Sequence, residues 1–103
     1  MKFKRLVASA VMGALFSGAA WAQVKIGVVS SSTGPVAMVG IPQKNSVPLM
    51  PTKVGNLTVQ YVPLDDGSDP TASVVAIKKL ISEENVDAII GPSGSPNAMG
   101  VIQ

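Results

Sequence analysis

The sequence predicts an α/β fold: a parallel sheet built as β-α-β-α-β, followed by the start of a third helix. Two observations carry this prediction. Residues 24–30 and 86–90 are almost entirely apolar, and each segment runs directly into a turn of Gly, Ser and Pro. Strands that are apolar throughout are usually buried on both faces, as in parallel sheets covered by helices. A helical pattern that starts at Pro70 supplies the connection between the second and third strands.

Residues 1–22 are expected to be a signal peptide. Lys2, Lys4 and Arg5 precede an apolar run over 6–16, and Ala20-Trp21-Ala22 fits the Ala-x-Ala cleavage pattern. The run is shorter than the roughly 20 residues that a membrane-spanning helix needs. We therefore expect an exported, periplasmic chain whose fold occupies residues 23–103. The alternative is an ordinary N-terminal helix.

The helix after the first strand has a weak pattern. Gly40 disfavours a helix, Pro42 is expected only at a helix start, and Pro48 interrupts one. We therefore expect a short or kinked helix over 43–50, followed by a turn at 52–56.

The second strand is expected over 57–64, where apolar and polar residues alternate. Pro63 lies near its end and cannot donate to a sheet ladder, which places this strand at an edge. An edge position for the second strand agrees with the strand order 2-1-3 of open α/β sheets.

The second helix has clear start signals. Asp69 is a good N-cap, and Pro70 stands where a missing N–H does no harm. The third strand is expected over 86–90 and a last helix from Ser95 or Pro96, with the chain expected to end inside that helix. The apolar residues predicted for the buried face of the second helix are Val74, Ile77, Leu80 and Ile81.

Composition excludes several classes of function. The chain has no Cys and no His, which excludes zinc sites built on them and nucleophiles activated by His. Residues 23–103 hold five lysines and six acidic residues, so no basic cluster favours nucleic acid. Asp65, Asp66 and Asp69 lack the spacing of a calcium loop, and carboxylates alone are a weak signal for catalysis. We expect no enzyme, no metal and no cofactor.

The loop over 91–96 is the best candidate site. A Gly/Ser turn at a helix start exposes backbone N–H groups that attract an anion such as a carboxylate. Ser93 and Ser95 add hydroxyl donors, and Gly94 lets a ligand approach the backbone closely. The loop over 30–34 ends a neighbouring strand, so both loops are expected to present hydroxyl groups and amides at one edge of the sheet. The alternative is an ordinary strand-to-helix connection.

Three short segments together resemble one family. They are Thr33-Gly34-Pro35, Leu64-Asp65-Asp66 and Ile90-Gly91-Pro92-Ser93. With the signal before them, they are similar to the exported branched-chain amino-acid-binding proteins of ABC transporters, which have the type I periplasmic binding fold. The resemblance implies two lobes joined by a hinge, with residues 23–103 as a truncated first lobe.

The resemblance also implies a ligand site. The family's loop after the third strand holds the ligand's α-carboxylate, which here falls on Ser93, Gly94, Ser95 and Pro96, with Ser95 as the hydroxyl contact. The loop after the first strand supplies a second wall, near Val36 to Val39, where some members place an aromatic ring.

The expected function is the solute-binding component of an amino-acid importer. Its partners would be an amino acid or similar small carboxylate and the membrane permease of the transporter. The alternative is a truncated product that binds no ligand. An exported α/β enzyme is a third possibility, disfavoured by the missing His and Cys.

Overall fold

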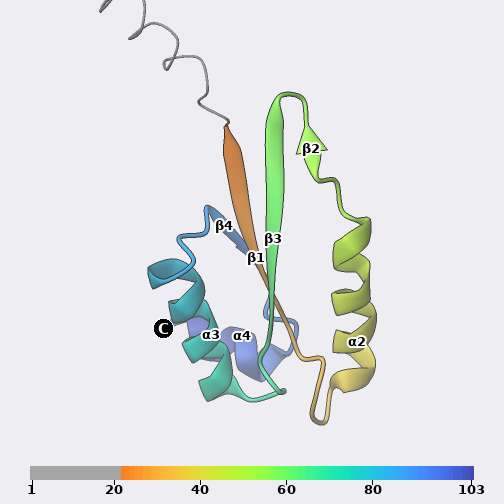
Figure 1. The fold of residues 1–103 in the computed structure, drawn as a ribbon. Helices are drawn as coiled ribbons and strands as arrows, with labels where there is room; N and C mark the ends of the chain where they lie inside the picture. The colour runs from red at the N-terminus through yellow and green to blue at the C-terminus, as the bar shows by residue number, and fades with distance from the viewer. Residues whose placement is uncertain (1–21) are drawn as a thin grey trace, which may run out of the picture.

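The structure, a computed structural model, describes residues 22–103, so the expected signal peptide falls outside the described residues except for Ala22. Strands and helices alternate along most of the described chain (Figure 1). In chain order the elements are β1 (Gln23–Ser30), α2 (Ala37–Ser46), the 3₁₀ helix η1 (Val47–Leu49), β2 (Lys53–Val54), β3 (Leu57–Asp65), α3 (Pro70–Ser82), β4 (Ala88–Ile90) and α4 (Ser95–Ile102).

The sheet has the order β2-β3-β1-β4. β1 pairs in parallel with both β3 and β4, with Val28 opposite Pro63 on one side and Ile90 on the other. The predicted order 2-1-3 is therefore confirmed for the three parallel strands. The turn expected at 52–56 instead contains β2, which pairs antiparallel with the first two residues of β3 and makes the sheet mixed.

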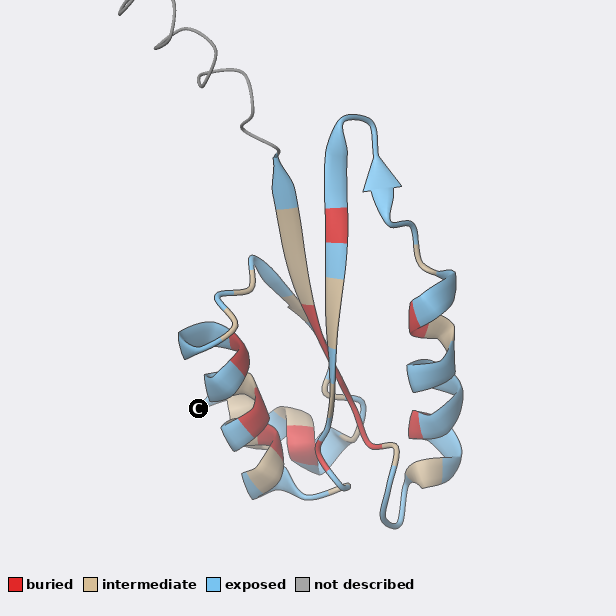
Figure 2. Cartoon of the chain, in the orientation of Figure 1, coloured by how far each residue is buried: buried red, intermediate tan, exposed pale blue. Residues whose placement is uncertain are grey.

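The helices cover both faces of the sheet. Figure 1 shows α2 on one side and α3 with α4 on the other. Figure 2 shows the buried residues along the second half of β1 and on the inner side of α3. The core cluster is made of Val29, Ala76 and Leu80, and Leu80 is 0% exposed. A Cβ built on Gly27 would lie 2.6 Å from Leu80 Cδ1, so the glycine lets α3 pack close to β1.

The buried face of α3 differs in part from the prediction. Leu80 is buried as expected, but Ile81 is 59% exposed. Ser73 and Ala76 are buried instead. Small side chains at these two positions let the helix approach the sheet, and the Ser73 hydroxyl has a buried acceptor, described below.

The prediction for the first helix was wrong at its start. α2 begins at Ala37 and contains Pro42 in its interior, although a proline there removes one helical hydrogen bond. The reason is a tertiary contact. A Cβ built on Gly40 would lie 1.9 Å from the carbonyl oxygen of Ser31, so the helix packs on the loop after β1 through its glycine.

The predicted starts of the two later helices are confirmed. The Asp69 side chain accepts a hydrogen bond of 2.7 Å from the Ala72 N–H, with Pro70 as the first helical residue. α4 begins at Ser95. β4 is shorter than expected, and the chain before it is held by Lys25, whose Nζ pairs with Glu84 Oε2 at 3.1 Å. Within residues 22–103, no helix has the length and apolar character to cross a membrane.

Candidate functional site

The loops after β1 and β4 meet at one edge of the sheet. Because β1 and β4 are parallel neighbours, their carboxyl ends lie side by side. A small hollow of about 90 Å³ separates the two loops. It is lined by Ser31, Val36, Val39, Gly40, Ser93 and Gly94.

The structure brings together some of the predicted site residues. Ser93, Gly94 and Val39 share the lining of this hollow. Ser95 and Pro96 are outside the lining and form the exposed first turn of α4.

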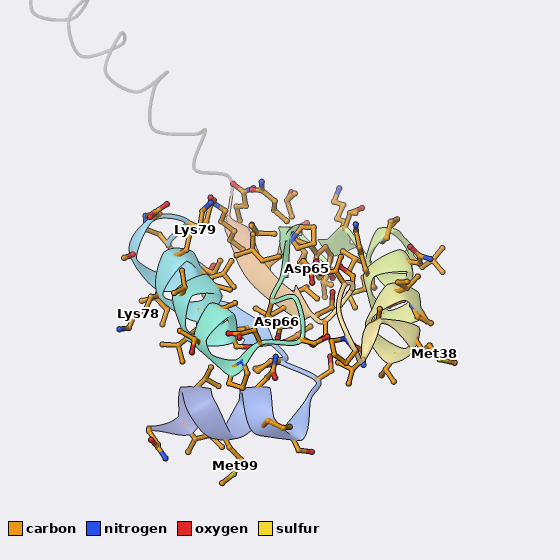
Figure 3. All side chains as sticks on the ribbon, turned by 90° about the horizontal axis from the view of Figure 1, so that it is seen from below. Met38, Asp65, Asp66, Lys78, Lys79 and Met99 are labelled. Carbon is orange, nitrogen blue, oxygen red and sulfur yellow. The ribbon has the colours of Figure 1, made fainter. Side chains whose placement is uncertain are left out.

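The wall predicted near Val39 belongs to a helix. Val39 lies in the first turn of α2 and is 56% exposed. The neighbouring Met38 is 90% exposed, and its side chain points away from the rest of the chain (Figure 3). Only Val39 of these two residues faces the hollow.

A hydrogen bond connects the second loop to α2. The Ser93 hydroxyl donates to Oε1 of Gln43. Both residues also line a neighbouring hollow of about 220 Å³ between α2 and the ends of β1 and β4. Sequence reasoning missed Gln43, because the helix that carries it was expected to start there rather than six residues earlier.

The start of α4 has no side-chain cap. Its N-cap is Gly94, and no side chain accepts a hydrogen bond from the first turn. Pro96 has no N–H, so Ser95 and Asn97 provide the backbone donors of this turn. Such donors at a helix start, together with the helix dipole, favour an anion.

Two amides of the first loop are already bound within the chain, which corrects in part the expectation for residues 30–34. Asp65 Oδ1 accepts from the backbone N–H groups of Ser32 at 3.0 Å and Thr33 at 3.3 Å. Its Oδ2 accepts from the Thr33 hydroxyl at 2.7 Å. The loop therefore already binds a carboxylate of its own chain. The Thr33 hydroxyl, with backbone donors of Gly67, Ser32 and Thr33, lowers the pKa of Asp65 against the opposing effect of desolvation.

Asp66 is buried at this edge of the sheet. Its side chain is 1% exposed and accepts four hydrogen bonds (Figure 3 shows its position between α3 and α4). Oδ1 accepts from Ser31 Oγ at 2.7 Å and from the Ser68 N–H at 3.0 Å. Oδ2 accepts from Ser73 Oγ and from Asn97 Nδ2, both at 2.7 Å. Burial alone would raise the pKa of Asp66, but these donors outweigh it and lower the pKa.

The aspartates have structural partners rather than the geometry of a metal or acid–base site. Asp69 caps α3, Asp65 holds the first loop, and Asp66 joins four segments. Across the described range 22–103, no group of three or more His, Cys, Asp or Glu side chains could hold a metal ion. Sequence reasoning missed the role of Asp66, because a polar residue in a polar loop carries no sign of burial.

A larger groove lies away from the two loops. Its volume is about 640 Å³, and it runs along α3 beside the end of β3, where Val75 and Lys79 line it. Its carboxylates, Asp65 and Asp69, already accept hydrogen bonds from the chain. Both carboxylates of the groove thus serve the fold of the chain itself.

Comparison with known proteins identifies the family of this chain. The family model described as periplasmic binding protein matches residues 23–103. This chain belongs to the periplasmic binding protein family. No curated protein sequence matches the chain as a relative.

Solved structures of periplasmic binding proteins share the fold. An extracellular ligand-binding receptor from Rhodopseudomonas palustris HaA2 is 43% identical, with a TM-score of 0.76, over 79% of this chain and 22% of its own. A solute-binding protein of an ABC transporter from R. palustris, in complex with 4-hydroxybenzoate, is 36% identical, with a TM-score of 0.67, over 77% of this chain and 23% of its own. A leucine-binding protein from Thermotoga maritima is 30% identical, with a TM-score of 0.65, over 76% of this chain and 23% of its own. The chain thus spans less than a quarter of the length of these proteins.

Proposed function

We propose that this chain supplies the carboxylate-binding part of a solute-binding protein that delivers a small organic acid or amino acid to an ABC importer. The protein would work outside the cytoplasmic membrane, exported by residues 1–22, and would pass its ligand to a membrane permease. The observation that carries the proposal is the meeting of the Ser93–Gly94 loop, the uncapped start of α4 and the first turn of α2 around one hollow.

The ligands named for two relatives favour a carboxylate. One relative is a leucine-binding protein, and the other is in complex with 4-hydroxybenzoate. Leucine is aliphatic and carries an amino group, whereas 4-hydroxybenzoate is aromatic and has none. The carboxylate is the charged group that they share. A segment common to both proteins is therefore best suited to bind that group.

The donors at the start of α4 suit this role. A carboxylate placed beside Gly94 would accept hydrogen bonds from the backbone N–H groups of Ser95 and Asn97. The Ser95 hydroxyl is exposed at the same turn and would add a further donor. Ser93 already donates to Gln43, so its hydroxyl would bind a ligand only after exchanging that partner.

Val39 would contact the uncharged part of the ligand and limit its size. It is apolar, it faces the hollow, and it lies opposite the loop that would bind the charged end. An apolar wall opposite a small set of polar donors is the usual composition of small-molecule sites. We therefore expect the carboxylate to be bound at Gly94 and Ser95 and an apolar group to lie against Val39.

The test is a titration of the chain followed by NMR of its backbone amides, with sodium acetate and acetamide as matched probes. Acetamide has the size of acetate but no charge. Acetate is expected to shift the amide signals of Gly94, Ser95 and Asn97, whereas acetamide leaves them in place. Equal shifts with both probes, or no shift at these residues, would contradict the proposal.

A variant pair identifies the hydroxyl contact. Ser95→Ala removes the proposed hydroxyl donor and is expected to weaken acetate binding about fivefold, since a hydrogen bond contributes about 1 kcal/mol. Ser82→Ala is the control, because Ser82 Oγ donates only to the Lys78 carbonyl on α3. Unchanged binding by Ser95→Ala would remove Ser95 from the site and leave the backbone donors.

A further inference from the structure

The two oxygens of Asp66 bind the two segments that meet at the hollow, the loop after β1 and the first turn of α4. Oδ1 accepts from Ser31, a lining residue on the loop after β1. Oδ2 accepts from Asn97, which lies in the first turn of α4. Asp66 itself lies behind the hollow and is absent from its lining.

Asn97 connects Asp66 to the ligand loop. Its side chain is 2% exposed and packs against Gly94, because a Cβ built on Gly94 would lie 3.3 Å from Asn97 Oδ1. The N-cap Gly94 is also bound through its carbonyl to the Ala98 N–H at 2.8 Å. The start of α4 thus has no cap of its own, and its nearest side-chain support is Asn97, held by Asp66.

We propose that Asp66 is a positioning residue for ligand binding: through Ser31 and Asn97 it sets the place of the Gly94 loop relative to the loop after β1. The proposal rests on the proposed function of this hollow. An ionised carboxylate only accepts hydrogen bonds, so Asp66 holds at once the lining residue Ser31 and Asn97, which lies behind the lining residue Gly94. The role is separate from direct contact with the ligand, because Asp66 is buried.

Ser73 provides a matched control for this role. It donates to the same oxygen as Asn97, at the same distance of 2.7 Å, and is also buried. Neither residue lines the hollow, but Asn97 belongs to the first turn of α4 beside Gly94, whereas Ser73 belongs to α3. Removing either donor takes one buried hydrogen bond from Asp66, and only the loss of the Asn97 donor frees the start of α4.

The experiment compares Asn97→Ala with Ser73→Ala in the whole chain. Thermal unfolding followed by circular dichroism measures stability, and NMR measures acetate binding and hydrogen exchange of the Gly94 and Ser95 amides. Both variants are expected to lose stability, and Ser73→Ala at least as much, because Ser73 Oγ also donates to the Asp69 carbonyl at 3.1 Å. Asn97→Ala is expected to weaken acetate binding about fivefold or more and to speed exchange at Gly94, whereas Ser73→Ala changes neither beyond twofold. Equal effects of the two variants, or wild-type values in Asn97→Ala, would overturn the proposal.

A reciprocal exchange gives an independent readout if Asn97→Ala unfolds. Asn97→Asp alone brings two carboxylates into contact, whereas Asp66→Asn with Asn97→Asp restores one donor and one acceptor. The double variant is expected to recover the exchange rate at Gly94, and failure to recover it would contradict the role of the pair. If acetate does not bind the wild-type chain, the proposed function fails. The exchange rates of the ligand-free variants then still decide whether Asp66 positions the loop.

Discussion

Gly40 of α2 lies directly on the carbonyl group of Ser31, so that a Cβ at position 40 would come within 1.9 Å of the Ser31 oxygen. This contact places the first turns of α2 against the loop after β1. It also brings Val39, one position earlier, to the hollow between the loops. One residue without a side chain thus sets one wall of the candidate site.

Gly40→Ala is expected to destabilise the chain by about 2 kcal/mol, because backbone atoms of α2 and the Ser31 loop must move apart. The higher helix propensity of Ala offsets only about 1 kcal/mol of the full effect. Urea unfolding of the chain measures the change.

Gly100→Ala is the control for this prediction. Gly100 lies in α4, and a Cβ there would meet its nearest atoms, in Pro70, at an ordinary 3.5 Å. This variant is expected to be neutral or more stable by up to about 1 kcal/mol. If both variants shift the urea midpoint in the same direction, the packing argument for Gly40 is wrong.

The contact between Gly27 and Leu80 predicts a coupled pair. Gly27→Ala alone forces the buried Leu80 side chain to move and is expected to destabilise by about 1–3 kcal/mol. Leu80→Ala alone leaves a cavity and is expected to cost about 2–5 kcal/mol. In the double variant the new methyl group fills part of that cavity. The loss of stability is therefore expected to be smaller than the sum of the losses in the two single variants. Additive losses in urea unfolding would contradict the contact.

Acid is expected to destabilise the fold through Asp66. Its pKa is lower in the folded chain than in the unfolded chain, where an Asp titrates near pH 3.9. The stability that this carboxylate contributes is therefore complete above about pH 5 and is lost as the pH falls through 3.9 toward the lower folded pKa. Urea midpoints measured between pH 7 and pH 3 are expected to fall less steeply in Asp66→Asn. Equal slopes in the variant and the wild type would show that Asp66 is not responsible.

The Thr33 hydroxyl is expected to control the pKa of Asp65. Thr33→Val removes the hydrogen bond at Oδ2, which is the largest cause of the lowered value, and keeps the backbone donors at Oδ1. The pKa of Asp65 is therefore expected to rise toward its ordinary value while staying below it. A carbon-13 NMR titration of the side-chain carboxyl measures this, and an unchanged pKa would exclude the hydroxyl as its cause.

The chain is expected to bind its ligand weakly. The hollow of about 90 Å³ is far smaller than the roughly 300–1,000 Å³ of sites that enclose small molecules. A ligand there stays largely in water, where hydrogen bonds to charge are weak. We expect dissociation constants of about 1 mM or higher for leucine, glutamate and phenylalanine. A dissociation constant of about 1 mM corresponds to a binding free energy of about −4 kcal/mol. Calorimetry that gave micromolar affinity would contradict this.

The sequence predicted most of the fold because its signals were local. Asp69 and Pro70 mark the start of α3 in the sequence itself, and the apolar strands β1 and β4 stand out by composition. β2 has two residues and no pattern of its own, so its pairing with β3 could not be predicted. The early start of α2 depends on the contact between Gly40 and Ser31, and neither residue type indicates this packing in the sequence.

The candidate site was predicted less completely than the fold. The meeting of the two loops followed from neighbouring parallel strands, and Ser93, Gly94 and Val39 do share one hollow. The hydrogen bonds of Asp65 and Asp66 were not predictable, since aspartates in a turn are normally solvated. The side-chain partners lie in the loop after β1, in α3 and in α4, which only the tertiary fold brings together.

Pro63 makes the two borders of the sheet chemically unequal. The Val59 N–H points toward β2, where it donates to Thr52, and alternate residues of β3 point the same way. The nitrogen of Pro63 therefore faces the uncovered part of that border and has no hydrogen to offer a docking strand. β4 has no proline among its three residues. A strand docking beside Pro63 would therefore lack one hydrogen bond that a strand docking on β4 would not lack.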